Sequence, residues 1–251
     1  MARLAEQNAH PRDARIKFEE STHTYTLDGD ASQNTSVTTF LHKLFPHFDA
    51  DSVIEKMMSG RNWSKSPYFG RTKESIKNGW EKSGRLAADQ GTKMHLNIEN
   101  FYEGLPHETS SKEFKLFQEF VNDHPWEMYR TEWVVFHEEA KICGSIDAVF
   151  KDPDDDKALV IADWKRSKEI KYQNSWESGT HPLTKGLQHC NFILYSLQLS
   201  TYRFILEVKY GAKINQTPFL VILHPSQTSY QKIETIDLRD VVKKLFDERI
   251  N

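Results

Sequence analysis

The sequence predicts an α/β fold, with one central β-sheet flanked by helices and an N-terminal helical extension. Strand patterns gather in the middle of the chain and recur towards its end, whereas helical patterns stand before and after them. One sheet covered by helices on two sides is the usual architecture for such an order of elements. The expected strands are 129–137, 142–150, 158–165, 219–224 and 232–236.

The length of 251 residues is compatible with a single large domain. We expect this domain at 16–251, with a helical part at about 36–124 and a core at about 128–224. The segment 1–15 is polar and mixed in charge, which predicts a disordered leader and is unlike a secretory signal.

Ahead of the strands, turn formers and cap residues mark the first elements. A small hairpin is expected at 16–20 and 23–27. Ser36 is a favoured N-cap for a helix over 36–44, and a second helix is expected at 51–58.

A long helix is expected from Thr72, its N-cap, to about Tyr102. Gly84 and Gly91 are the positions where it would be interrupted, because glycine weakens a helix interior. Gly104 and Pro106 follow it as stop signals. The remaining helices are expected at 111–122, 185–210 and 238–250.

Two short acidic motifs lie in what the sequence predicts as a hairpin. Gly144-Ser145-Ile146-Asp147 belongs to its first strand, and Asp163-Trp164-Lys165 ends its second. The connection 151–157 is dense in Asp and Pro, which are turn formers. With the turn centred on Asp155, Asp147 lies directly opposite Asp163. Lys165 shares the face of Asp163, because side chains alternate along a strand.

Opposed carboxylates repel each other unless a cation or a proton lies between them. The apolar run 159–162 before Asp163 is typical of a strand buried on both faces, and charges that end such a run rarely lack a role. A hard divalent cation held by one or two carboxylates is the Mg²⁺ pattern. The alternative is an exposed edge pair that Lys165 bridges.

Two further groups of side chains fit a metal centre. Gly91, His95 and Glu99 follow one another at intervals of one helical turn and share a face. Glycine allows a close approach to the backbone, and neutral imidazole is a good metal ligand. Gln198 and Tyr202 share a face of a later helix as a pair of neutral hydrogen-bonding groups. Taken singly, each group is more often explained by ordinary helix packing.

The formal net charge is −3, but basic residues are concentrated between Lys56 and His95. That segment has nine Lys or Arg residues and three acids, interleaved with Trp63, Tyr68, Phe69 and Trp80. Cations on phosphates and rings on bases are typical of proteins that bind single strands, whereas the alternative is a solvated helix face. The residues expected to contact nucleic acid in this segment are Arg71, Lys73, Lys77, Trp80 and Lys93.

The two cysteines, Cys143 and Cys190, are too few for a four-cysteine zinc or iron–sulfur site within one chain. Such low cysteine usage is typical of a reduced, intracellular protein. No apolar run approaches the roughly 20 residues that a membrane-spanning helix needs. We therefore expect an intracellular location, in the cytoplasm, the nucleus or a virus-infected cell, without a membrane partner.

Taken in order, the four motifs resemble those of the PD-(D/E)xK nuclease superfamily, in particular its RecB-like exonuclease branch. They are Gly91-Thr92 with His95 and Glu99, Gly144-Ser145 with Asp147, Asp163-Trp164-Lys165, and Gln198 with Tyr202. The segment Ser36-Val37-Thr38 is similar to one in the phage and mitochondrial genome-maintenance exonucleases. The resemblance covers about residues 35 to 210.

The resemblance implies a restriction-endonuclease-like core with a mixed central sheet, and a Mg²⁺ or Mn²⁺ cofactor. Some relatives carry a four-cysteine iron–sulfur cluster, but this chain lacks the cysteines, so no such cluster is expected. It assigns the catalytic positions to Lys165, Asp163 and Asp147. The implied metal ligands are His95, Asp147, Asp163 and the backbone carbonyl of Trp164. The accessory positions are Glu99, Gln198 and Tyr202, and Ser36 and Thr38 join the residues expected to contact nucleic acid.

The function that the resemblance implies is hydrolysis of DNA phosphodiester bonds, by an exonuclease that acts on single-stranded DNA or DNA ends. Its partners would be DNA and a helicase or replication protein, in replication, recombination or repair. Two alternatives stay open. One is a structure-specific endonuclease, and the other is a nucleic-acid-binding module without catalysis.

Overall fold

The computed structural model describes residues 3–32 and 34–251. The chain forms two compact units: His47–Lys93 is one, and the residues before and after it form the other. These bounds do not coincide with the expected helical part at about 36–124. The helix α4 (Lys73–Glu103) contributes residues to both units.

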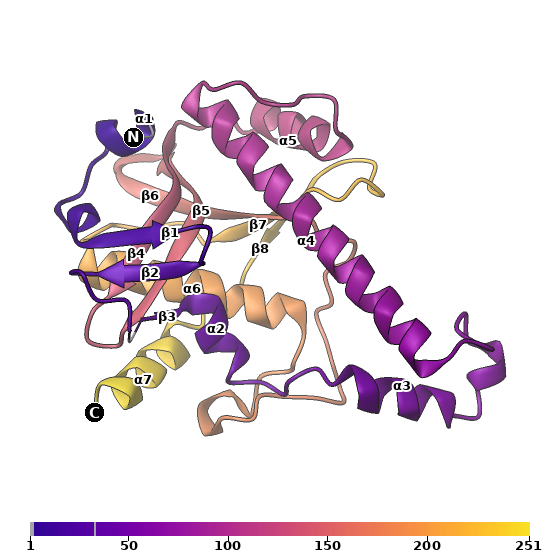
Figure 1. Cartoon of the computed structure of the whole chain (residues 1–251). Coiled ribbons are helices and arrows are strands. Elements are labelled where there is room, and N and C mark those ends of the chain that lie inside the picture. Colours follow the sequence, from indigo (N-terminus) through magenta and orange to yellow (C-terminus); the bar gives the residue numbers. More distant parts are fainter. Residues whose placement is uncertain (1–2, 33) are drawn as a thin grey trace. The chain divides into compact units, whose positions relative to one another are not determined.

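The larger unit is built on a six-stranded mixed sheet (Figure 1). The strand β5 pairs antiparallel with β4 and β6, whereas β3 runs parallel to β5 and β7 runs parallel to β6. The antiparallel strand β8 closes the edge beside β7. This confirms the predicted mixed sheet. Its strands are β3 (Thr35–Ser36), β4 (Met128–His137), β5 (Ile142–Asp152), β6 (Asp155–Lys165), β7 (Phe219–Ile222) and β8 (Gln231–Glu234).

Helices cover both faces of this sheet, because its central strands are apolar on both sides. On β6, Ile161 packs in one hydrophobic cluster with residues of α2 (Val37–His42), α6 (Asn191–Lys209) and α7 (Arg239–Ile250). Val160 and Trp164 pack in a second cluster with the end of α4 and with α5 (Lys112–Asp123). The alternation along β6 therefore places Asp163 and Lys165 on the α6 side.

The register between β5 and β6 agrees with the predicted opposition of the two aspartates, although the ladder itself ends one pair before them. Ala148 pairs with Ala162, so the next position along the ladder brings Asp147 opposite Asp163. The turn itself differs from the prediction. The register shifts between Lys151 and Asp152, Asp152 pairs with Asp155, and the chain reverses within that pair and not at Asp155. Residues 156–158 of β6 lie between these two pairs without a counterpart on β5, and the register is continuous from Lys151–Leu159 to Ala148–Ala162.

The N-terminal segment is ordered where it is described, so the expected disordered leader is wrong for residues 3–15. It forms α1 (Arg3–Gln7) and the 3-10 turn η1 (Pro11–Arg15), and Leu4 is buried. Asp13 ties this segment to β4, because it accepts hydrogen bonds from Arg130 and from the indole of Trp133. The remaining residues of the expected leader, 1 and 2, lie outside the described residues. The predicted hairpin follows as β1 (Ile16–Glu19) and β2 (Thr24–Leu27).

The helices follow the sequence with two differences. Ser36 caps α2 by accepting a hydrogen bond from the Thr39 amide, as expected. The helix α4 continues through Gly84 and Gly91 without a break. The helix α6 begins at Asn191 and not at 185, because the chain before it pairs with an earlier loop: the Gly179 amide donates to the Leu187 carbonyl. The other helical elements are α3 (Ala50–Met58), η2 (Trp63–Lys65) and η3 (Pro182–Thr184).

Among residues 3–32 and 34–251, none of the helices combines the length and the apolar character that crossing a bilayer requires.

Candidate metal centre

The four motifs meet along the part of β5 that lies between its pairing with β3 and its pairing with β6. Along one edge of β5, Ile142 and Cys143 pair with β3, whereas pairing with β6 begins at Ala148. The intervening residues include Gly144 and Asp147. A Cβ atom on Gly144 would lie 2.9 Å from the ring of Tyr202, so glycine at this position lets that buried ring pack against the strand.

Asp147 on β5 links this strand to β6 where the pairing between the two strands ends. Its Oδ2 accepts a hydrogen bond of 2.9 Å from the backbone amide of Trp164, just beyond the last ladder pair. The same oxygen lies 3.5 Å from Nδ1 of His95 on α4. One carboxylate therefore contacts β6 and α4 from β5, and burial together with the charge of Glu132 raises its pKa.

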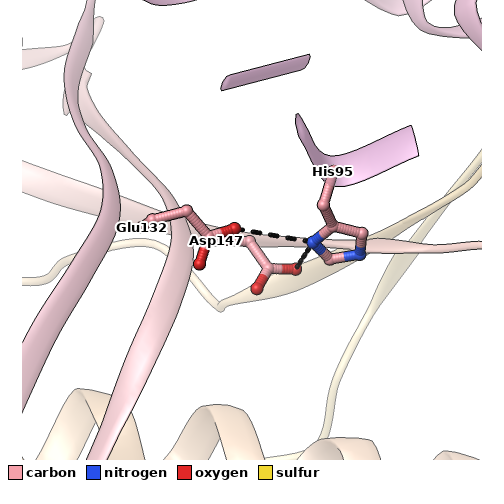
Figure 2. A group of neighbouring side chains, drawn as sticks. All are labelled: His95, Glu132 and Asp147. Atoms are coloured by element: carbon pink, nitrogen blue, oxygen red, sulfur yellow. Dashed lines mark ion pairs between the residues drawn. The ribbon is translucent and has the colours of Figure 1, made fainter. Parts of the chain in front are cut away.

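His95 lies between the carboxylates and the backbone of β6 (Figure 2). Its Nε2 lies 2.9 Å from the carbonyl oxygen of Trp164, and its Nδ1 lies 3.6 Å from Oε1 of Glu132. Burial opposes protonation of the ring, but Asp147 and Glu132 outweigh it and raise the pKa of His95 to about 9. The two carboxylates thus favour a protonated ring between them.

Glu132 is the site residue that the sequence reasoning missed. It lies on β4 opposite Asp147, between the pairs that Thr131 and Trp133 make with β5. Its φ of +42° is left-handed, which costs a non-glycine residue about 1–3 kcal/mol and is concentrated at functional sites. Its Oε2 accepts a hydrogen bond of 2.7 Å from Ser145. The sequence feature that could have indicated Glu132 is its position as an acid directly before the apolar run 133–136.

One ligand atom from each of His95, Glu132 and Asp147 can be chosen so that all three lie within 4.8 Å of one another. Two carboxylates and an imidazole nitrogen are donors that suit a hard divalent cation of the Mg²⁺ or Mn²⁺ type. When the ring of His95 is neutral, the two carboxylates repel each other unless a cation lies between them. These residues therefore fit a divalent cation.

Asp163, the other expected ligand, is engaged by Lys165. The Lys165 Nζ lies 2.6 Å from Oδ2 of the fully buried Asp163, and within the described residues that oxygen has no hydrogen-bond donor of good geometry. Burial and the charge of Asp147 raise the pKa of Asp163 to about 6. Burial opposes the charge of Lys165, but Asp163 and Asp147 outweigh it and raise the lysine pKa.

A small hollow of about 260 Å³ opens beside Lys165. The ammonium lies 4.9 Å from the centre of the Tyr195 ring, a cation–π contact that fixes it at this wall. Gln198 lies at the hollow, and its amide makes a long contact of 3.5 Å with the hydroxyl of Tyr202. The hollow is lined by Thr38, Leu41, His42, Lys165, Asn191, Leu194, Tyr195 and Gln198.

Two other expected residues lie near the centre without joining the triad. Glu99 stands one helical turn beyond His95, where burial and the charge of Glu132 raise its pKa to about 7. Ser36 uses its hydroxyl as the cap of α2, while Thr38 on the first turn of that helix reaches the hollow. Glu99 is therefore a neighbour of the centre, and Thr38 is better placed than Ser36 to contact a ligand.

The basic residues expected to bind nucleic acid lie in the unit His47–Lys93, and most are engaged there. Lys73 forms ion pairs with Asp51 and Glu55, and Lys77 forms one with Asp51. Arg71 donates to the carbonyl of Ser75. The ring of Trp80 packs against Phe48 and Tyr68, and Lys93 is exposed. Lys73 and Lys77 are thus poor candidates for phosphate contacts.

No protein-family model matches the chain, and no curated protein matches it. The resemblance to nucleases therefore rests on the motif residues alone. His95, Asp147 and the Asp163–Lys165 pair lie together, and Gln198 with Tyr202 flanks them from α6.

Proposed function

We propose that the protein is a metal-dependent nuclease that hydrolyses DNA phosphodiester bonds on a restriction-endonuclease-like core of the PD-(D/E)xK superfamily. The observation that carries this proposal is the charged pair Asp163–Lys165 placed beside Asp147 and His95, at the point where β5 and β6 separate. A cluster of carboxylates and a lysine held charged next to an open hollow suits an anionic substrate that reacts with water.

His95, Glu132, Asp147 and Asp163 are the side chains that would hold Mg²⁺ or Mn²⁺. The carbonyl of Trp164, also expected as a ligand, faces Nε2 of His95, whereas the carboxylates of Glu132 and Asp147 face Nδ1. When bound, such a cation polarises a phosphate oxygen and makes water more acidic. A metal held with the two carboxylates would bind Nδ1 of His95, so the ring must release the proton on that nitrogen. The Nε2–H group would still donate to the carbonyl of Trp164.

Lys165 supplies the fixed positive charge of the reaction. Its ammonium is held by Asp163 on one side and by the face of Tyr195 on another. From this position it donates a hydrogen bond to the attacking water or to a phosphate oxygen as negative charge develops. Removing one donor of this type typically costs about 2.7–4 kcal/mol of transition-state stabilisation.

We favour an exonuclease acting on single strands or DNA ends. The hollow beside Lys165 has a volume of about 260 Å³, which favours one extruded or terminal nucleotide over a duplex. A structure-specific endonuclease and a catalytically silent binding module are the competing functions. A helicase or replication protein is the partner expected to supply unwound ends.

The proposal is tested by incubating the protein with end-labelled linear single strands, linear duplexes and closed circles, in Mg²⁺, in Mn²⁺ and in EDTA. An exonuclease releases short products from linear substrates alone. Cleavage of circles would identify an endonuclease. Asp163→Asn is the control for contaminating nucleases, and the absence of metal-dependent cleavage on every substrate would contradict the proposed chemistry.

A further inference from the structure

The unit His47–Lys93 contains positive charge that the proposed metal centre does not use. It has nine Lys or Arg residues and six Asp or Glu residues. Two of the acids, Asp51 and Glu55, are engaged by Lys73 and Lys77. Without these two lysines and two acids the unit has seven Lys or Arg residues and four acids, so it keeps an excess of three positive charges.

Three of these cations, Lys56, Arg61 and Lys65, border a single open hollow of about 760 Å³. All three are exposed, and no acidic side chain contributes to the described wall. Within residues 3–32 and 34–251, none of the three has an ion-pair partner. The rest of the wall consists of Met57, Gly60, Asn62, Trp63 and Ser66.

The backbone fixes where these cations stand. The helix α3 ends beside Gly60, whose amide donates to the Met57 carbonyl. A Cβ atom on Gly60 would lie 3.3 Å from two carbonyl oxygens of that last turn, so the tight reversal favours glycine. The Trp63 amide then donates to the Gly60 carbonyl and starts η2. The three cations thus come from the end of α3, the reversal and η2.

Three like charges around one hollow repel each other. The carboxyl end of α3 offsets them by only about half a unit charge. A polyanion in the hollow would relieve this repulsion, and its affinity would depend on salt. Trp63 adds a second kind of contact, since its indole forms part of the wall and is fixed by an edge-on contact with Phe69, with ring centres 5.8 Å apart.

We propose that this hollow binds single-stranded nucleic acid, with Lys56, Arg61 and Lys65 on neighbouring phosphates and Trp63 against a base. Phosphate contacts combined with an aromatic platform are how single strands are held without sequence preference. The site lies wholly within the unit His47–Lys93, and it replaces Lys73 and Lys77 as the basic contacts of that unit. It does not rest on the proposed chemistry, because binding can be measured without a metal.

The test is fluorescence anisotropy of a labelled fifteen-nucleotide oligothymidine with the full chain in EDTA, over a range of salt concentrations. The variant Lys56→Ala/Arg61→Ala should reduce the slope of log affinity against log salt by about 1.4, the value for two lost contacts on a single strand. The control Lys82→Ala/Arg85→Ala removes the same charge from exposed positions on α4 of the same unit. It should change the slope by less than half as much.

Trp63→Leu should weaken binding roughly 5- to 150-fold with an unchanged salt slope, because a leucine keeps apolar contact with Phe69 but cannot stack on a base. Thermal unfolding of each variant shows whether the comparison is made on folded protein. An equal reduction of the salt slope in the test and control variants would overturn the site. It would show that binding depends on the overall positive charge of the unit and not on the residues at the hollow. Binding of polyglutamate with the same affinity and the same loss in the variants would overturn the assignment to nucleic acid in favour of an acidic protein partner.

Discussion

The ammonium of Lys165 lies 2.6 Å from Oδ2 of Asp163, two residues earlier on the same strand. Both side chains leave β6 on the face that α6 covers, so the pair is fixed by the pleat of the strand. Asp163 is buried and lies opposite Asp147 in the register. The lysine is therefore held in its charged form beside Asp163 and Asp147, whose carboxylates would repel each other without it.

The first prediction concerns the role of this lysine. Lys165→Met should lower the turnover of a single-stranded substrate by about two to three orders of magnitude, because it removes one donor to the developing phosphate charge. Mn²⁺ affinity, measured by calorimetry, should fall by less than tenfold, since the lysine is not a ligand. A parallel collapse of metal affinity and turnover would show that Lys165 assembles the centre and has no separate role in the reaction.

Glu132 gives the second prediction, on the metal. Glu132→Gln keeps the shape of the side chain but removes its charge, and it should weaken Mn²⁺ binding by about 10- to 100-fold, the range for residues that support a metal centre. Glu127→Gln, on an exposed glutamate that pairs with Lys151, is the matched control and should leave the affinity unchanged. Unchanged Mn²⁺ affinity in Glu132→Gln would remove Glu132 from the ligand set.

The third prediction uses the left-handed backbone of Glu132. In an ordinary strand glycine is less stable than alanine, but a φ of +42° reverses this preference. Glu132→Gly should therefore be more stable than Glu132→Ala, by about 1 kcal/mol in the free energy of unfolding. Chemical denaturation of the two variants measures the difference. The ordinary order, with alanine more stable, would mean that the strand relaxes to an extended conformation without the glutamate.

The sequence predicted the opposition of Asp147 and Asp163 from a turn centred on Asp155. The chain reverses between Asp152 and Asp155 instead, and only the register shift after that turn gives the predicted alignment. It did not predict Glu132 as a site residue, since a single acid in a strand is usually an outward-facing residue and its left-handed backbone leaves no signal in the sequence. The ion pairs of Lys73 and Lys77 were missed because their partners, Asp51 and Glu55, lie just outside the segment whose charge was counted. The late start of α6 depends on hydrogen bonds between residues 187–189 and the preceding loop at 177–179, which periodicity cannot reveal.

The fourth prediction is a dependence of stability on pH that a divalent cation reverses. In the metal-free protein the pKa of Asp163 is raised from 3.8 to about 6 and that of His95 from 6.5 to about 9. A raised pKa means that the folded state favours the protonated form of the group. The stabilisation that each group gives the folded state is therefore complete below its ordinary pKa and is lost as pH rises through its raised pKa. The contribution of Asp163 should disappear between about pH 4 and 6, and that of His95 between about pH 6.5 and 9.

Mn²⁺ requires the deprotonated carboxylate and the neutral imidazole, so its stabilising effect has the opposite dependence. The rise in melting temperature on adding Mn²⁺ should be small at pH 5.5 and several degrees larger at pH 8.5. In His95→Gln the metal-free decline between pH 6.5 and 9 should be smaller than in the parent protein. An Mn²⁺ effect that is the same at both pH values would contradict the proposed centre.

The last prediction tests the close packing behind the metal centre. A methyl group on Gly144 would lie 2.9 Å from both Oη and Cε1 of Tyr202 and 3.2 Å from a methyl of Val37. Tyr202 is almost fully buried, so the ring cannot swing away and the strand must move. Gly144→Ala should therefore lower the free energy of unfolding by about 1–3 kcal/mol, the usual cost of overpacking a core. The control Gly186→Ala, where nothing lies within 4 Å, should leave stability nearly unchanged.

Because Tyr202 is the obstacle, Gly144→Ala/Tyr202→Leu should be less destabilised than the sum of the single variants, by about 0.5–3 kcal/mol. Strictly additive effects in that cycle would mean that the alanine is accommodated elsewhere, and that the glycine beside Asp147 does not serve to admit Tyr202.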